Sequence, residues 1–157
     1  MPHSSHGADG REQCFEDYVP GSVRTFGTIL VKEEEIIDFA KRYDPQVFHI
    51  DPVAARETVY GGLVASGWHT AAMAMRLIAE NYLSRTAGAG SPGVDELRWL
   101  KPVRPGDKLS VRVSILEARR SVSKPDRGVV RSFVEVLNQD MAVVMTWRGV
   151  NIVLCRD

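Results

Sequence analysis

An aspartate and a histidine five residues apart are the side chains of this sequence whose types and spacing best suit chemistry. Asp44 and His49 belong to the segment YDPQVFHID, residues 43–51. A carboxylate and an imidazole can together hold and activate a water. The pair therefore predicts a site that adds water to a substrate or removes it. The simpler interpretation is an aspartate in a turn and a partly buried histidine bonded to a loop.

A glycine-rich approach to a long apolar segment is the second chemical feature. Gly61-Gly62 and then Ser66-Gly67 come directly before that segment. A helix that begins at a glycine offers free backbone N–H groups and a positive dipole end to a developing oxyanion, so Gly67 is the candidate oxyanion donor. The candidate substrate-binding residues are Gln46, Gly62, Ser66 and Trp68. Glycine also permits tight turns and close packing, and this structural interpretation is compatible with the functional one.

The elements that position these residues follow from hydrophobic periodicity and helix-breaking residues. Residues 23–31 alternate in part and predict a strand, and residues 32–43 have apolar positions at helical spacing. Pro45 ends this helix, because the residue before a proline is pushed out of the helical region, and that residue is Asp44. Asp51 precedes a proline that suits a first helical position, so Asp51 is predicted to cap a second short helix rather than to catalyse.

The longest helical pattern runs from about Ser66 to Leu83 and is apolar on most sides. Such a helix must be enclosed by other parts of the structure. Trp68, Met73 and Met75 are predicted to be core residues, with the alternative that one of them lines a tunnel for an acyl chain. His69 falls in the first turn and is predicted to be a buried structural histidine with one hydrogen bond.

From Val94 onward the chain has the pattern of consecutive strands joined by short turns. Residues 108–115 alternate between polar and apolar, and residues 129–137 and 141–154 are also strand-like. A buried helix followed by antiparallel strands predicts an α+β fold in which a curved sheet wraps around the helix. Residues 1–18 are predicted to form a flexible arm and residues 19–157 a single domain.

The composition of the chain bears on its partners, metals and location in the cell. The 157 residues are 44% hydrophobic and 25% charged, as in soluble globular domains, and their formal net charge is zero. This balance gives no reason to expect nucleic acid or a membrane as partner. The two cysteines, Cys14 and Cys155, form no ligand cluster, so no metal is expected. Because the sequence shows neither a signal peptide nor a membrane-spanning apolar run, a cytoplasmic protein is expected.

Three segments in order resemble a known family. They are the motif from Asp44 through His49 to Asp51-Pro52, the stretch from Gly62 to Gly67 that opens the long helix, and the turn KPVRPGD at residues 101–107. Together they resemble the MaoC-like dehydratases and (R)-specific enoyl-CoA hydratases of the hotdog fold. The resemblance covers about residues 20–154.

The resemblance implies roles for individual residues. Asp44 and His49 would form the water-activating pair, and the Gly67 N–H would bind the carbonyl oxygen of a thioester. The chain departs from the usual motif at Gln46, Val47 and Ser66, where the family commonly has asparagine, proline and histidine.

The resemblance also implies an activity. It is the reversible hydration of a trans-2-enoyl-CoA thioester to the (R)-3-hydroxyacyl-CoA, by a hydro-lyase with no cofactor beyond the coenzyme A of its substrate. A homodimer is expected, because a single sheet around one helix leaves an edge to cover. Two alternatives stay open: a hotdog acyl-CoA thioesterase, and a non-catalytic acyl-CoA-binding hotdog protein. The basic residues around the proline turn are either ligands of coenzyme A phosphates or solvated charges: Arg98, Lys101, Arg104 and Lys108.

Overall fold

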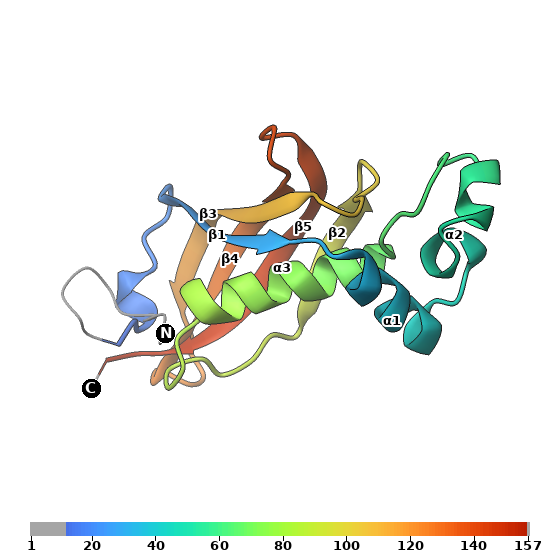
Figure 1. The fold of residues 1–157 in the computed structure, drawn as a ribbon. Coiled ribbons are helices and arrows are strands. Elements are labelled where there is room, and N and C mark those ends of the chain that lie inside the picture. The colour runs from blue at the N-terminus through green and yellow to red at the C-terminus, as the bar shows by residue number, and fades with distance from the viewer. Residues whose placement is uncertain (1–11, 157) are drawn as a thin grey trace.

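A five-stranded antiparallel sheet curves around one long helix, α3 (Figure 1). The structure is a computed structural model and describes residues 12–156. The strands are β1 (Val23–Leu30), β2 (Gly93–Trp99), β3 (Lys108–Arg120), β4 (Arg127–Leu137) and β5 (Val143–Leu154), and α3 is Gly67–Asn81. Their order across the sheet is β1-β3-β4-β5-β2, with all neighbours antiparallel. The α+β hotdog fold predicted from the sequence is confirmed.

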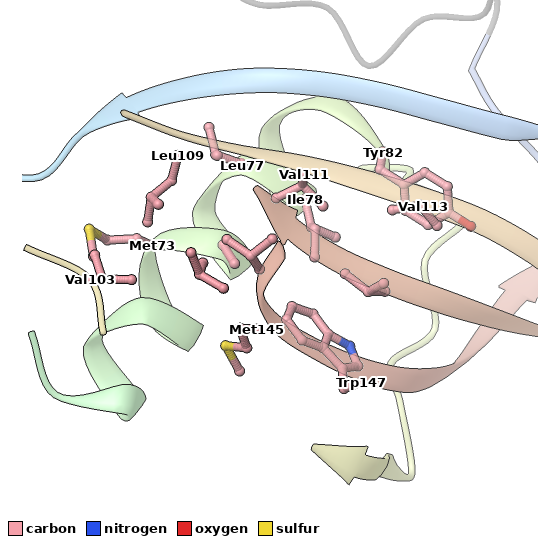
Figure 2. Close-up of a cluster of buried hydrophobic side chains, with 14 of the residues drawn as sticks. Met73, Leu77, Ile78, Tyr82, Val103, Leu109, Val111, Val113, Met145 and Trp147 are labelled. Atoms are coloured by element: carbon pink, nitrogen blue, oxygen red, sulfur yellow. The ribbon is translucent and has the colours of Figure 1, made fainter. Parts of the chain in front are cut away.

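The hydrophobic core lies between α3 and the face of the sheet that α3 covers (Figure 2). Alternate residues of β3 point into it, as the period of two predicts: Leu109, Val111, Val113 and Ile115 are all buried. β5 contributes Met145 and Trp147, and α3 contributes Met73, Leu77 and Ile78. This packing fixes α3, and with it the glycine at its start, relative to the sheet.

One prediction about α3 was wrong, because the helix is enclosed on one side and exposed on the other. Met73 is buried as predicted, but Trp68 and Met75 are 58% and 46% exposed. Among the described residues, the elements that contact α3 are mainly β1, β3 and α1, and the side of the helix that carries Trp68 and Met75 is left exposed. Within residues 12–156, no helix is both long enough and apolar enough to cross a membrane.

Two short helices gather near the N-terminal end of α3 (Figure 1). α1 (Glu33–Tyr43) forms where the sequence predicts it, whereas α2 (Val47–Ile50) was not predicted, because four residues show no periodicity. Asp51 Oδ1 accepts the N–H groups of Val53 and Ala54, which are the N-cap and the first residue of the 3-10 turn η2 (Ala54–Glu57). Asp51 thus satisfies backbone N–H groups at the start of a turn, as a capping aspartate does, although the N-cap position of η2 itself is Val53.

Residues 12–18 pack against the sheet and the end of α3, although the sequence places them in a flexible arm. The Glu12 carboxylate accepts hydrogen bonds from a serine hydroxyl and two backbone N–H groups just beyond α3. A 3-10 turn, η1 (Phe15–Asp17), follows, and Tyr18 is buried with its hydroxyl donating to a carbonyl oxygen at the end of α3. The rest of the predicted arm, residues 1–11, lies outside the described residues.

Candidate active site

Asp44 and His49 come from consecutive short elements and meet near the start of α3. Asp44 is the C-cap of α1, immediately before Pro45, and His49 lies in α2. The distance from Asp44 Oδ2 to His49 Nε2 is 3.4 Å. The pair that the sequence spacing predicts is therefore brought together, and one water beside it can contact both groups.

The His49 ring is oriented by a backbone carbonyl. His49 Nδ1 is 2.6 Å from the carbonyl oxygen of Val64, and because a carbonyl only accepts, Nδ1 carries a proton and donates it. In the neutral imidazole the lone pair is then on Nε2, which lies on the Asp44 side. A water that donates one hydrogen to this nitrogen and one to the carboxylate keeps its own lone pairs free for attack.

Three groups around Asp44 favour its ionised form. Ser66 Oγ donates to Oδ2 and Gln46 Nε2 donates to Oδ1, each at 2.7 Å. Burial raises the pKa of the Asp44 carboxyl, but these two hydrogen bonds and the nearby His49 outweigh it and hold that pKa below its usual value. Asp44 is therefore a carboxylate, and thus an acceptor, at neutral pH.

Gly67 is the first residue of α3, and Ser66 is its N-cap. Among residues 12–156 the Gly67 N–H has no hydrogen-bond acceptor, as expected for the first N–H of a helix. The indole of Trp99 lies directly against this glycine: a Cβ added to Gly67 would be 2.5 Å from Trp99 Nε1. A side chain here would clash, so the close approach requires glycine.

These groups open onto a cleft with a volume of about 510 Å³. Asp44, His49 and Gly67 line it, together with Gln46 and Trp68. The remaining lining is mainly apolar and aromatic, with Phe48, Tyr60, Trp99, Leu100, Val103 and Val144 among its members. A cleft of this size with a few convergent polar groups is typical of a small-molecule site.

Two of the predicted substrate-binding residues occupy other places. Ser66 is fully buried and does not line the cleft; it lies behind Asp44 and bonds to it. Gly62 does not line the cleft either, since it lies beside the guanidinium of Arg104. Arg104 in turn donates to the Tyr60 carbonyl oxygen at 2.6 Å and so ties the glycine-rich loop to the proline turn.

Several cleft residues could not be singled out from the sequence. Thr70 lies one turn into α3 and Trp99 ends β2, and both line the cleft. Of the four basic residues proposed as phosphate ligands, Lys101 alone lines it. The proline turn at residues 101–107 is recognisable in the sequence. Its position beside the start of α3 depends on contacts between residues far apart in the chain, which the sequence does not show.

His69 lies on another side of α3 from the cleft. Its ring stacks on Phe39, with centroids 4.7 Å apart, and is buried as predicted. The predicted hydrogen bond is absent at Nδ1, which is buried with no partner among the described residues. Burial lowers the pKa of the imidazole despite the charge of Glu35. Residues 12–156 contain no cluster of three or more His, Cys, Asp or Glu side chains that could hold a metal ion.

Comparison with known proteins decides the family. The family model described as "MaoC like domain" matches residues 16–136. The chain belongs to the MaoC-like domain family. This MaoC-like domain is 27% identical over 125 residues to the uncharacterised protein YdeM of Bacillus subtilis, covering 79% of this chain and 86% of that protein. It is 28% identical over 115 residues to Protein MaoC of Klebsiella aerogenes, covering 73% of this chain but only 33% of that longer protein.

Solved structures of MaoC-like proteins have the same fold. The MaoC-like dehydratase from Rhodospirillum rubrum superposes with a TM-score of 0.85 at 38% identity, over 92% of this chain and 99% of that one. The (R)-hydratase PhaJ1 from Pseudomonas aeruginosa superposes with a TM-score of 0.71 at 23% identity, over 93% and 88%. At 23% identity, the similarity to PhaJ1 shows a shared fold alone.

Proposed function

We propose that this MaoC-like domain is a hydro-lyase that reversibly hydrates a trans-2-enoyl-CoA thioester to the (R)-3-hydroxyacyl-CoA. The proposal rests on the meeting of Asp44 and His49 at a cleft where Gly67 begins α3. These groups supply an activated water and an oxyanion donor, which are the two requirements of the reaction. The (R) configuration is carried over from the similarity to an (R)-hydratase.

In the hydration direction, the water beside Asp44 and His49 forms a C–O bond to C3 of the enoyl group. The C2=C3 π electrons move toward the thioester carbonyl, and the Gly67 N–H and the positive end of α3 stabilise the enolate oxygen. The proton that leaves the water is taken up by the pair and delivered to C2 on the same face. The protein returns to its starting protonation state, and dehydration is the reverse.

The test is a hydration assay that follows loss of the enoyl-thioester absorbance, on wild type, Asp44→Asn and His49→Ala. Each variant should lower kcat by roughly 10²- to 10⁴-fold, because each removes one of the two groups that position and deprotonate the water. Release of free thiol instead of loss of the enoyl group would identify a thioesterase and contradict the proposal.

Asp51→Asn and His69→Ala serve as matched controls, since both residues lie outside the cleft. Both should keep near wild-type kcat per folded protein. Full activity in Asp44→Asn and His49→Ala would show that the pair does not catalyse, and tight acyl-CoA binding without turnover would favour a binding protein.

A further inference from the structure

The base of the cleft is closed by buried side chains. Ala65, Thr70, Val103 and Val144 line it and are between 1% and 8% exposed. Trp68, Trp99 and Leu100, in contrast, are about half exposed and form the rim. The cleft therefore has an open rim and a base that ends inside the protein.

Packed core lies behind this base. Met73 and Met145 are 5% and 0% exposed and belong to the same buried cluster as Val103 (Figure 2). A second cavity, of about 140 Å³, lies further along α3 against Ile78 and Trp147. It shares no lining residue with the cleft, so the two cavities are separate.

From this closed base we infer that the site selects short acyl chains, with its optimum at the four- or six-carbon enoyl group, and that Val103 sets the limit. The inference rests on the proposed function, which fixes the thioester carbonyl at Gly67 and C3 beside Asp44 and His49. The rest of the acyl chain then has only the space between those atoms and the base. The Trp99 indole lies against Gly67 and occupies that side of the helix start.

Val103 is the residue best placed to set this limit. Its side chain is 3% exposed and lines the cleft, while its carbonyl oxygen accepts a hydrogen bond from the Ala65 N–H at 2.8 Å. Truncation to alanine keeps that backbone bond and removes two methyl groups, which adds room at the base for about two carbons of an acyl chain. Each methylene buried in an apolar pocket is worth roughly a fourfold change in affinity.

The test compares trans-2-enoyl-CoA substrates of four, six, eight and ten carbons in wild type and Val103→Ala. In wild type, kcat/KM should fall steeply beyond six carbons, by about 10- to 200-fold for the first methylene that does not fit. In Val103→Ala, the ratio of kcat/KM for the first excluded substrate to that for the four-carbon substrate should rise at least about fourfold.

Val136→Ala is the matched control, since Val136 is a fully buried valine that lines neither cavity. It should lose stability without changing chain preference. A ten-carbon substrate used as well as the four-carbon one, or the same shift in both variants, would overturn the inference.

Failure of hydration altogether would count against the proposed function, and a binding measurement then decides the inference separately. Calorimetric titration with saturated butanoyl- and decanoyl-CoA should give one-to-one binding that is tighter for butanoyl-CoA. Equal or tighter one-to-one binding of decanoyl-CoA would contradict a closed base.

Discussion

At the scale of single residues, the acid of the pair is controlled by a side chain that never reaches the cleft. Ser66 donates to Asp44 Oδ2, and its Oγ also accepts the N–H of Trp68 at 3.3 Å as the cap of α3. One hydroxyl therefore joins the carboxylate to the helix whose first N–H is the proposed oxyanion donor. The sequence indicates the pair through its spacing, but it cannot show that Ser66, 22 positions from Asp44, completes it.

Ser66→Ala should raise the pKa of Asp44. The folded pKa lies below the ordinary value, so the carboxylate contributes stability above the ordinary pKa, and that contribution is lost as pH falls through the folded pKa. Removing this donor should raise the folded pKa of Asp44, because the carboxylate loses one of the two side-chain hydrogen bonds that stabilise its ionised form. A carboxyl-¹³C NMR titration, with Asp44→Asn to assign the resonance, measures the shift.

Ser84→Ala provides the control for Ser66→Ala. Ser84 is another buried serine that bonds a carboxylate and accepts a backbone N–H, but outside the cleft. It should lower the unfolding temperature without moving the Asp44 titration. If the Asp44 pKa were unchanged in Ser66→Ala, Ser66 would act only as the N-cap of α3 and not on the carboxylate.

At the scale of elements, the position of α3 depends on an irregularity in β1. The pairing of β1 with β3 shifts register between Phe26 and Ile29, and Gly27 in this bulge has φ +83°. A Cβ at Gly27 would lie 2.6 Å from Leu77 Cδ2 on α3. The glycine thus meets two demands at once, a left-handed backbone and close approach of the strand to the helix.

Gly27→Ala should lower the free energy of unfolding by about 2–3 kcal/mol, from backbone strain of roughly 1–2 kcal/mol plus the clash with Leu77. Gly21→Ala separates the two causes, because Gly21 has φ +84° and open space around it, and it should lose about 1 kcal/mol. Urea denaturation measures both. Equal losses in the two variants would show that packing against Leu77 contributes nothing.

Elements with a local sequence pattern could be predicted, and elements without one could not. The alternation in β3 and the helical spacing of α1 are local signals, and both elements form where expected. α2 is one turn long and carries no such signal, although it holds His49. The exposure of Trp68 could not be predicted from the sequence. An apolar helix face indicates that other atoms should cover the helix, but it does not tell whether they belong to the same chain or to a partner.

At the scale of the whole molecule, one face combines unpaired backbone with exposed apolar side chains. β2 is an edge strand, and its residues are exposed except Leu97, which is half-buried. The apolar face consists of Trp68 and Met75 on α3 with Val94, Trp99 and Leu100 in and after β2, each between 46% and 58% exposed. Trp68 and Trp99 are in edge-to-face contact at 5.1 Å, which joins the helix side of this face to the strand side.

An uncovered edge strand next to exposed apolar side chains is unfavourable in water, and pairing with a second copy covers both. We therefore expect sedimentation equilibrium to give about twice the 17.4 kDa chain mass. Met75→Glu should shift the equilibrium toward monomer, by roughly 2 kcal/mol or more, because it buries an unpaired charge in the interface. Val122→Glu, at a 96% exposed valine in the β3–β4 turn, makes the same change away from the apolar face and should leave the dimer intact.

A wild-type monomer at micromolar concentration, or equal dissociation of both variants, would contradict the dimer. Since Trp68 and Trp99 also form the rim of the cleft, a monomeric Met75→Glu variant with a raised KM would place the substrate entrance beside the partner subunit.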